Sequence, residues 1–112
     1  MQLKWFIGLI IMVTAGGVAA QCKQPVQPEL EIDGTQDRRV DMMSAKQVLQ
    51  TYLTQADRYL DCLDRMGTIA MTSGKDTEAS RDQRIAAYSR VMAEMNAEVD
   101  AFRQQAELFN GR

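Results

Sequence analysis

The sequence predicts an all-α protein: an antiparallel two-helix hairpin, coiled-coil-like, with an extended N-terminal arm tied to the first helix by a disulfide. Two long stretches carry apolar residues at alternating spacings of three and four, the pattern of packed helices. A stretch with both prolines and no helical period precedes them. One cysteine lies in that stretch and the other in the first helical stretch. The 112 residues allow one small domain.

The first twenty residues have the layout of a secretory signal peptide. Lys4 supplies a positive charge, an apolar run extends to Val13, and small residues lead to Val18-Ala19-Ala20. We expect cleavage after Ala20, so that residues 1–20 are removed. The mature chain is then periplasmic or secreted.

Two alternatives to cleavage stay open. One is a retained membrane anchor, although the apolar stretch from Trp5 to Ala20 is shorter than the ~20 residues of a spanning helix. The other is lipidation of Cys22, although Gln21 is not the small residue that precedes a lipidated cysteine. Either alternative tethers the same domain to a membrane.

Residues 21–36 form the predicted arm. Pro25 and Pro28 restrict the backbone, and a turn-like Asp33-Gly34 follows them. A proline-recognition motif is the alternative for this spacing, but two prolines beside a cysteine are more simply a stiff strap with little conformational entropy to lose.

The two cysteines are expected to form a structural disulfide. Cys22 and Cys62 make an even count in an oxidising compartment, where thiols pair. Closing a loop of this length is worth about 4 kcal/mol in the chain-entropy model. Their separation excludes a Cys-x-x-Cys redox motif, and two thiolates without histidine are too few for a tetrahedral zinc site. We therefore expect no metal at this pair.

The first helix is predicted over about residues 38–66, with its start between 37 and 44. Asp37 and the pair Ser44 and Gln47 are its candidate caps. Its predicted seam is Met42, Ala45, Leu49, Tyr52, Ala56, Tyr59, Leu63 and Met66.

A connector rich in turn formers is predicted over residues 67–77, followed by the second helix over about 78–109, and Asn110-Gly111 ends the helix. Because each helix has one apolar seam and the nearest partner is the other helix, the two should fold back on each other within residues 37–112. The predicted seam of the second helix is Ile85, Tyr88, Met92, Met95, Val99, Phe102, Ala106 and Phe109.

The first helix is apolar on both flanks of its seam, with Leu53 and Leu60 on one flank and Val48 and Cys62 on the other. Because the disulfide pins the arm near the far end of the helix, the arm must run back antiparallel to it, along the Val48 flank. The arm residues expected to cover that flank are Val26, Leu30 and Ile32.

The Leu53/Leu60 edge, defined by those two side chains, is the candidate interaction surface. It is left for a second copy of the chain or for an envelope protein. The alternative is that long side chains of the second helix close over it. Sequence reasoning leaves both interpretations open.

Composition gives little support to catalysis or to nucleic-acid binding. Thirteen basic residues are scattered in a chain of net charge −2, so a basic patch is missing. The chain has no histidine, and it carries neither a phosphate-binding glycine loop nor a nucleophile motif. We therefore expect no enzyme, no catalytic residues, no cofactor and no small-molecule substrate.

Methionine spacing provides an alternative function, binding of a soft metal. Met92 and Met95 resemble the thioether pairs that suit copper(I), and Met66 or Met71 could add a further sulfur. Met92, Met95 and Met66 occupy predicted seam positions, where methionine fills gaps in a core. Core packing is therefore the preferred interpretation.

Several short motifs follow one another along the mature chain: Cys22-x-x-Pro25-x-x-Pro28, Ile32-Asp33-Gly34, Tyr59-Leu60-Asp61-Cys62-Leu63, Arg84, Ala87-Tyr88, Met95-Asn96 and Phe109-Asn110. In these motifs the chain resembles an uncharacterised group of small exported proteobacterial proteins. The resemblance implies a periplasmic location and brings no activity, cofactor or catalytic residue. We expect a non-enzymatic structural or protein-interaction module of the cell envelope, associating with itself or with an envelope protein.

Overall fold

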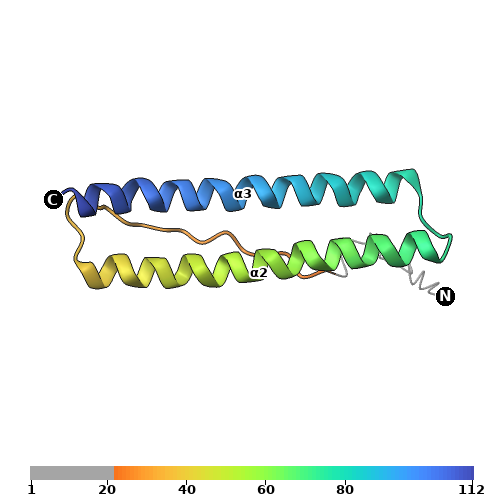
Figure 1. The fold of residues 1–112 in the computed structure, drawn as a ribbon, viewed down its shortest axis with the longest axis horizontal. Coiled ribbons are helices and arrows are strands. Elements are labelled where there is room, and N and C mark those ends of the chain that lie inside the picture. Colours follow the sequence, from red (N-terminus) through yellow and green to blue (C-terminus); the bar gives the residue numbers. More distant parts are fainter. Residues whose placement is uncertain (1–21) are drawn as a thin grey trace, which may run out of the picture.

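A computed structural model describes residues 22–112, so the predicted signal peptide and its cleavage site lie outside the described residues. Helices α2 (Arg39–Thr72) and α3 (Glu78–Asn110) run antiparallel, joined by a short connector (Figure 1). Strands are absent from the described part of the chain. Across residues 22–112, no helix has the length and hydropathy needed to cross a membrane. The predicted two-helix hairpin, with its arm tied to α2 by a disulfide, is confirmed.

Helix α2 begins one residue after Arg38, inside the predicted range. The Arg38 backbone N–H donates to the Asp41 carboxylate at 3.1 Å, and the two side chains also pair at 3.2 Å. These bonds replace the caps expected from Asp37 or Ser44, and they lower the pKa of the Asp41 carboxyl, the Arg38 side-chain bond contributing most.

Helix α2 ends later than predicted, because Gly67 does not stop it. The helix continues to Thr72, and the connector shrinks to the residues between Thr72 and Glu78. A Cβ at Gly67 would meet Arg84 Nε at 3.2 Å, so this glycine serves close packing against α3. The true stop is Gly74, with φ +68° and the hydrogen bonds of a Schellman motif around it.

Helix α3 begins where predicted, at Glu78, and ends one residue later than predicted. Thr77 is its N-cap and accepts a hydrogen bond from the Ser80 backbone N–H at 3.1 Å. Arg84, which lies about one turn before the predicted seam residue Tyr88, is buried. It donates from Nη2 to both oxygens of Asp76, at 3.0 and 2.9 Å. This ion pair fixes the connector onto the start of α3.

The predicted seam of α2 is confirmed. Its heptad positions are buried as far as Leu63, and Met66 packs against the core from its edge. The buried seam residues are Met42, Ala45, Leu49, Tyr52, Ala56, Tyr59 and Leu63.

The predicted seam of α3 is wrong at three of its eight positions. Ile85 is 57% exposed, and Met92 and Val99 are also exposed, whereas the residues immediately before the first two, Arg84 and Val91, are buried. Ala87 completes the buried set, and Tyr88, Met95 and Phe102 pack at its edge as predicted. Compared with the prediction, the buried face of α3 is rotated about the helix axis, because α3 packs against both α2 and the arm. The predicted seam considered α2 as the only neighbour, so it placed the buried residues one position too late in the sequence.

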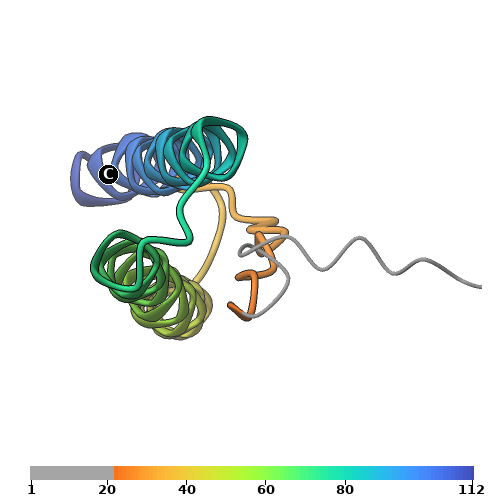
Figure 2. The ribbon, with the colours of Figure 1, turned by 90° about the vertical axis from the view of Figure 1, so that its right-hand side faces the viewer.

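The arm runs antiparallel to α2, along one side of the helix pair, as expected (Figures 1 and 2). Its buried and half-buried residues are first spaced by three and then by two: Cys22, Pro25, Pro28, Leu30, Ile32 and Gly34. Spacing by three is that of a polyproline II helix, and spacing by two is that of a strand. Val26 therefore points outward and is 81% exposed, so the expectation that it covers Val48 is wrong.

Both ends of the arm are fixed. The Cys22–Cys62 disulfide, with a Cα–Cα distance of 5.7 Å, holds the first end on α2. At the other end, the buried Gly34 donates from its backbone N–H to Gln105 Oε1 at 2.8 Å, and Arg112 Nη1 donates to its carbonyl oxygen at 3.4 Å. The arm is thus stretched from the middle of α2 to the C-terminal end of α3.

Candidate functional site

The Leu53/Leu60 edge is not a free surface. Leu60 is only 6% exposed, and Leu53 is half-buried and packs against the core. The α3 row Tyr88, Met95 and Phe102, at heptad spacing, packs against the same cluster. Most of this edge is therefore covered within one protomer, which favours the alternative interpretation, closure by long side chains of the second helix.

The candidate copper ligands are divided between core and surface. Met95 packs against the core cluster, as does Met66, whereas Met92 and Met71 are exposed. Within residues 22–112, no group of three His, Cys, Asp or Glu side chains is placed to hold a metal ion. Core packing of Met95 follows the preferred interpretation, and the copper alternative gains no supporting observation.

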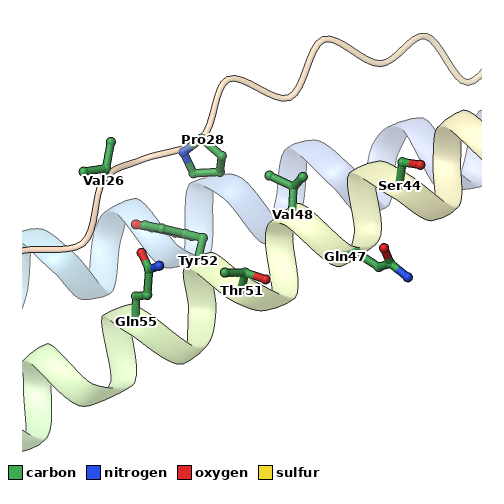
Figure 3. A pocket seen from close by; sticks show the side chains of 8 residues that line it. All are labelled: Val26, Pro28, Ser44, Gln47, Val48, Thr51, Tyr52 and Gln55. Carbon is green, nitrogen blue, oxygen red and sulfur yellow. The ribbon is translucent and has the colours of Figure 1, made fainter.

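A groove with a volume of about 490 Å³ lies between the arm and the N-terminal half of α2 (Figure 3). The arm supplies one wall and α2 supplies the floor and the other wall. The residues lining this arm groove are Val26, Pro28, Ser44, Gln47, Val48, Thr51, Tyr52 and Gln55.

All the residues that line the arm groove are uncharged, and they combine apolar with hydrogen-bonding side chains. Hydroxyl and amide groups of Thr51, Gln55 and their neighbours project from successive turns of α2. Val26 on the arm and Val48 on α2 are both exposed there, Val48 at 47%. The surface can therefore donate and accept hydrogen bonds beside an apolar strip, the composition that suits a neutral protein segment.

Tyr52 is the most buried of the residues that line the arm groove. Its side chain reaches from α2 towards the arm (Figure 3), and it is 2% exposed. Its hydroxyl has no hydrogen-bond partner in residues 22–112. Burial raises the pKa of this hydroxyl, and the carboxylates of Glu94 and Glu98 on α3 raise it further.

Sequence reasoning missed this groove because it assigned Val26 and Val48 to each other. The signal was available in part. Prolines spaced by three favour a three-residue repeat in the arm, and counting by three from Cys22 places Pro25 and Pro28 inward and Val26 outward. The depth of the groove depends on how far the arm stands from α2, which no local pattern encodes.

Comparison with known proteins finds no matching family model, curated protein or solved structure. The function is therefore argued from the arm groove and from the way the arm is held.

Proposed function

We propose that this chain is a non-enzymatic protein-interaction module of the cell envelope, and that the arm groove receives an uncharged segment of a partner protein. The observation that carries the proposal is the groove itself: two exposed valines flanked by neutral hydroxyl and amide groups. Protein interfaces commonly combine an apolar centre, depleted of charge, with a polar rim. The proposal moves the interaction surface from the Leu53/Leu60 edge to the opposite flank of α2.

An exported location supports this function. The disulfide is consistent with an oxidising compartment, where such bonds persist. We propose that the signal peptide is cleaved after Ala20 and that the mature chain works in the periplasm or outside the cell. In either location the exposed Val26 is accessible to other exported proteins.

Site-specific photo-crosslinking in the producing cells tests the groove as the docking surface. A photoreactive amino acid replaces Val48, inside the groove, or Asp57, which is exposed outside it. We expect a covalent adduct from position 48 and none from position 57. Mass analysis of the adduct then identifies the partner as another protein or as a second copy of this chain.

A matched pair of substitutions shows whether the groove itself is required. Thr51→Glu places a charge in the groove, whereas Thr54→Glu places the same charge on the exposed surface outside it. We expect the adduct at position 48 to disappear with the first variant and to persist with the second. Equal adducts at positions 48 and 57, or an adduct that survives Thr51→Glu, contradict the proposal.

A further inference from the structure

The arm is held at its two ends and only weakly between them. The backbone of residues 23–32 makes no hydrogen bond to any other part of residues 22–112. Between the anchors, only Pro25, Pro28, Leu30 and Ile32 are even half-buried. Pro25 and Pro28 also lack backbone N–H donors, which disfavours pairing of the arm as a strand. Among the described residues, the disulfide is therefore the only strong attachment at the N-terminal end of the arm.

The surface beneath the arm contains buried polar groups that would gain hydrogen bonds to water if the arm moved away. Tyr52 and Tyr59 are almost fully buried in the core cluster, yet neither hydroxyl has a hydrogen-bond partner in the described residues. A buried hydroxyl without a partner destabilises the folded state, and water supplies that partner once a cover is removed. The tyrosines thus reduce the free energy needed to lift the arm, whereas aliphatic residues at the same positions raise it.

The two cysteines of the disulfide differ in exposure. Cys22 is buried, but Cys62 is partly exposed on α2. Attack by a thiolate on the Cys62 sulfur breaks the S–S bond and releases Cys22, the residue that carries the arm. The far anchor at Gly34 does not depend on this bond, because its partners are on α3 and at the C-terminus.

We propose that the Cys22–Cys62 disulfide is a redox latch: its reduction releases residues 22–32 from the helices and uncovers the flank of the hairpin beneath them, while α2 and α3 stay folded. A dithiol reductant supplies two electrons and two protons. The S–S bond becomes two thiols, and the reductant becomes a disulfide. Because Val26 and Pro28 form one wall of the arm groove, reduction removes that wall, so the biological consequence rests on the proposed function.

Backbone ¹⁵N relaxation on the mature protein tests the latch without any partner. In the oxidised protein we expect order parameters of about 0.85 along the arm, and after reduction with dithiothreitol values below about 0.6 for residues 23–32. The amide signals of Arg39–Thr72 and Glu78–Asn110 keep their positions and order parameters except next to the arm. The pKa of Tyr52 falls back towards its ordinary value, because its cover is gone.

Two variants separate the latch from other effects. The double variant Cys22→Ser with Cys62→Ser reproduces the released arm, and dithiothreitol has no further effect on it. Oxidised Leu30→Ala keeps an ordered arm, because the disulfide rather than the apolar contacts holds it. An arm that stays ordered after reduction, or helices that melt together with it, overturns the proposal. Failure of crosslinking at Val48 leaves the relaxation result unchanged, so the two proposals can fail separately.

Discussion

At the scale of single residues, Gly34 shows how a small side chain positions a long segment. A Cβ at this position would overlap the carbonyl oxygen of Gln105 on α3, so only glycine lets the arm approach that helix. The preceding Asp33 shapes the same turn by accepting hydrogen bonds from the hydroxyl and backbone N–H of Thr35. These bonds, the hydroxyl first, lower the pKa of the Asp33 carboxyl.

Substitution Gly34→Ala tests this packing. We expect the free energy of unfolding to fall by about 1–3 kcal/mol, the usual cost of overpacking a tight contact. Urea denaturation followed by circular dichroism measures it. Gly111→Ala is the control, because a Cβ there meets nothing closer than 3.3 Å, and its effect should be much smaller. Equal stabilities of the two variants contradict the role given to Gly34.

The contribution of the Arg84–Asp76 ion pair to stability depends on its burial. Its two side chains are only 8% and 17% exposed, so removing the carboxylate leaves a buried, unpaired guanidinium. We expect Asp76→Ala to lower the free energy of unfolding by about 3 kcal/mol. Asp100→Ala breaks the exposed pair with Arg103 and should cost less than about 1 kcal/mol. Comparable losses in urea melts of the two variants exclude a special role for the buried pair.

At the scale of elements, the rotation of α3 decides which apolar side chains stabilise the hairpin. Leu60 of α2 is buried, whereas Ile85 of α3, a predicted seam residue, is exposed. We expect Leu60→Ala to cost about 2–5 kcal/mol and Ile85→Ala less than about 1 kcal/mol, because only the first creates a cavity. Thermal and urea unfolding of both variants check the expectation. A larger loss for Ile85→Ala restores the seam predicted from the heptads.

The contact between the arm and α2 predicts an alkaline dependence of stability. Burial holds the pKa of Tyr52 above its ordinary value of 10.0, which the unfolded chain keeps. The folded state therefore binds more protons above pH 10, and stability that is complete below pH 10 falls as the pH rises through the folded pKa. Urea unfolding at intervals between about pH 8 and pH 11 measures the fall.

Tyr52→Phe is the control for this titration. In the variant, the free energy of unfolding should fall less steeply above pH 10, because Tyr52 no longer titrates. At neutral pH it should be at least as stable as the parent, because the substitution removes a buried hydroxyl that has no partner in residues 22–112. A loss of stability at neutral pH indicates a hydrogen bond from this hydroxyl and weakens the argument for an arm that can be lifted.

At the scale of the whole molecule, the arm and both helices share one core. The cluster of buried residues joins Cys22 of the arm, the α2 seam from Leu49 to Leu63, and Ala87 and Val91 of α3. We therefore expect the oxidised protein to unfold in a single transition. Far-ultraviolet dichroism reports the helices and tyrosine fluorescence reports the arm side, and the two melting curves should coincide. Separate transitions show that the arm and the hairpin are independent units.

The sequence was sufficient to predict the class of fold, the existence of both helices and the disulfide, because these depend on local periodicity and on the pairing of two cysteines. It also determined the α2 seam, since one helix facing one partner repeats every seven residues. Its error at Gly67 arose because a helix-stop glycine and a close-packing glycine are identical in sequence, and only the approach of Arg84 distinguishes them.

Only the tertiary structure decided the rotation of α3 and the position of the candidate site. The arm occupies one side of the helix pair, so α3 packs against two neighbours, and its buried side shifts away from Ile85 and Met92. The same arrangement closes the Leu53/Leu60 edge and leaves the arm groove open. These outcomes depend on how the arm, α2 and α3 pack against one another, because the competition is for the same apolar surfaces. Periodicity describes each segment alone, so it carries no information about that competition.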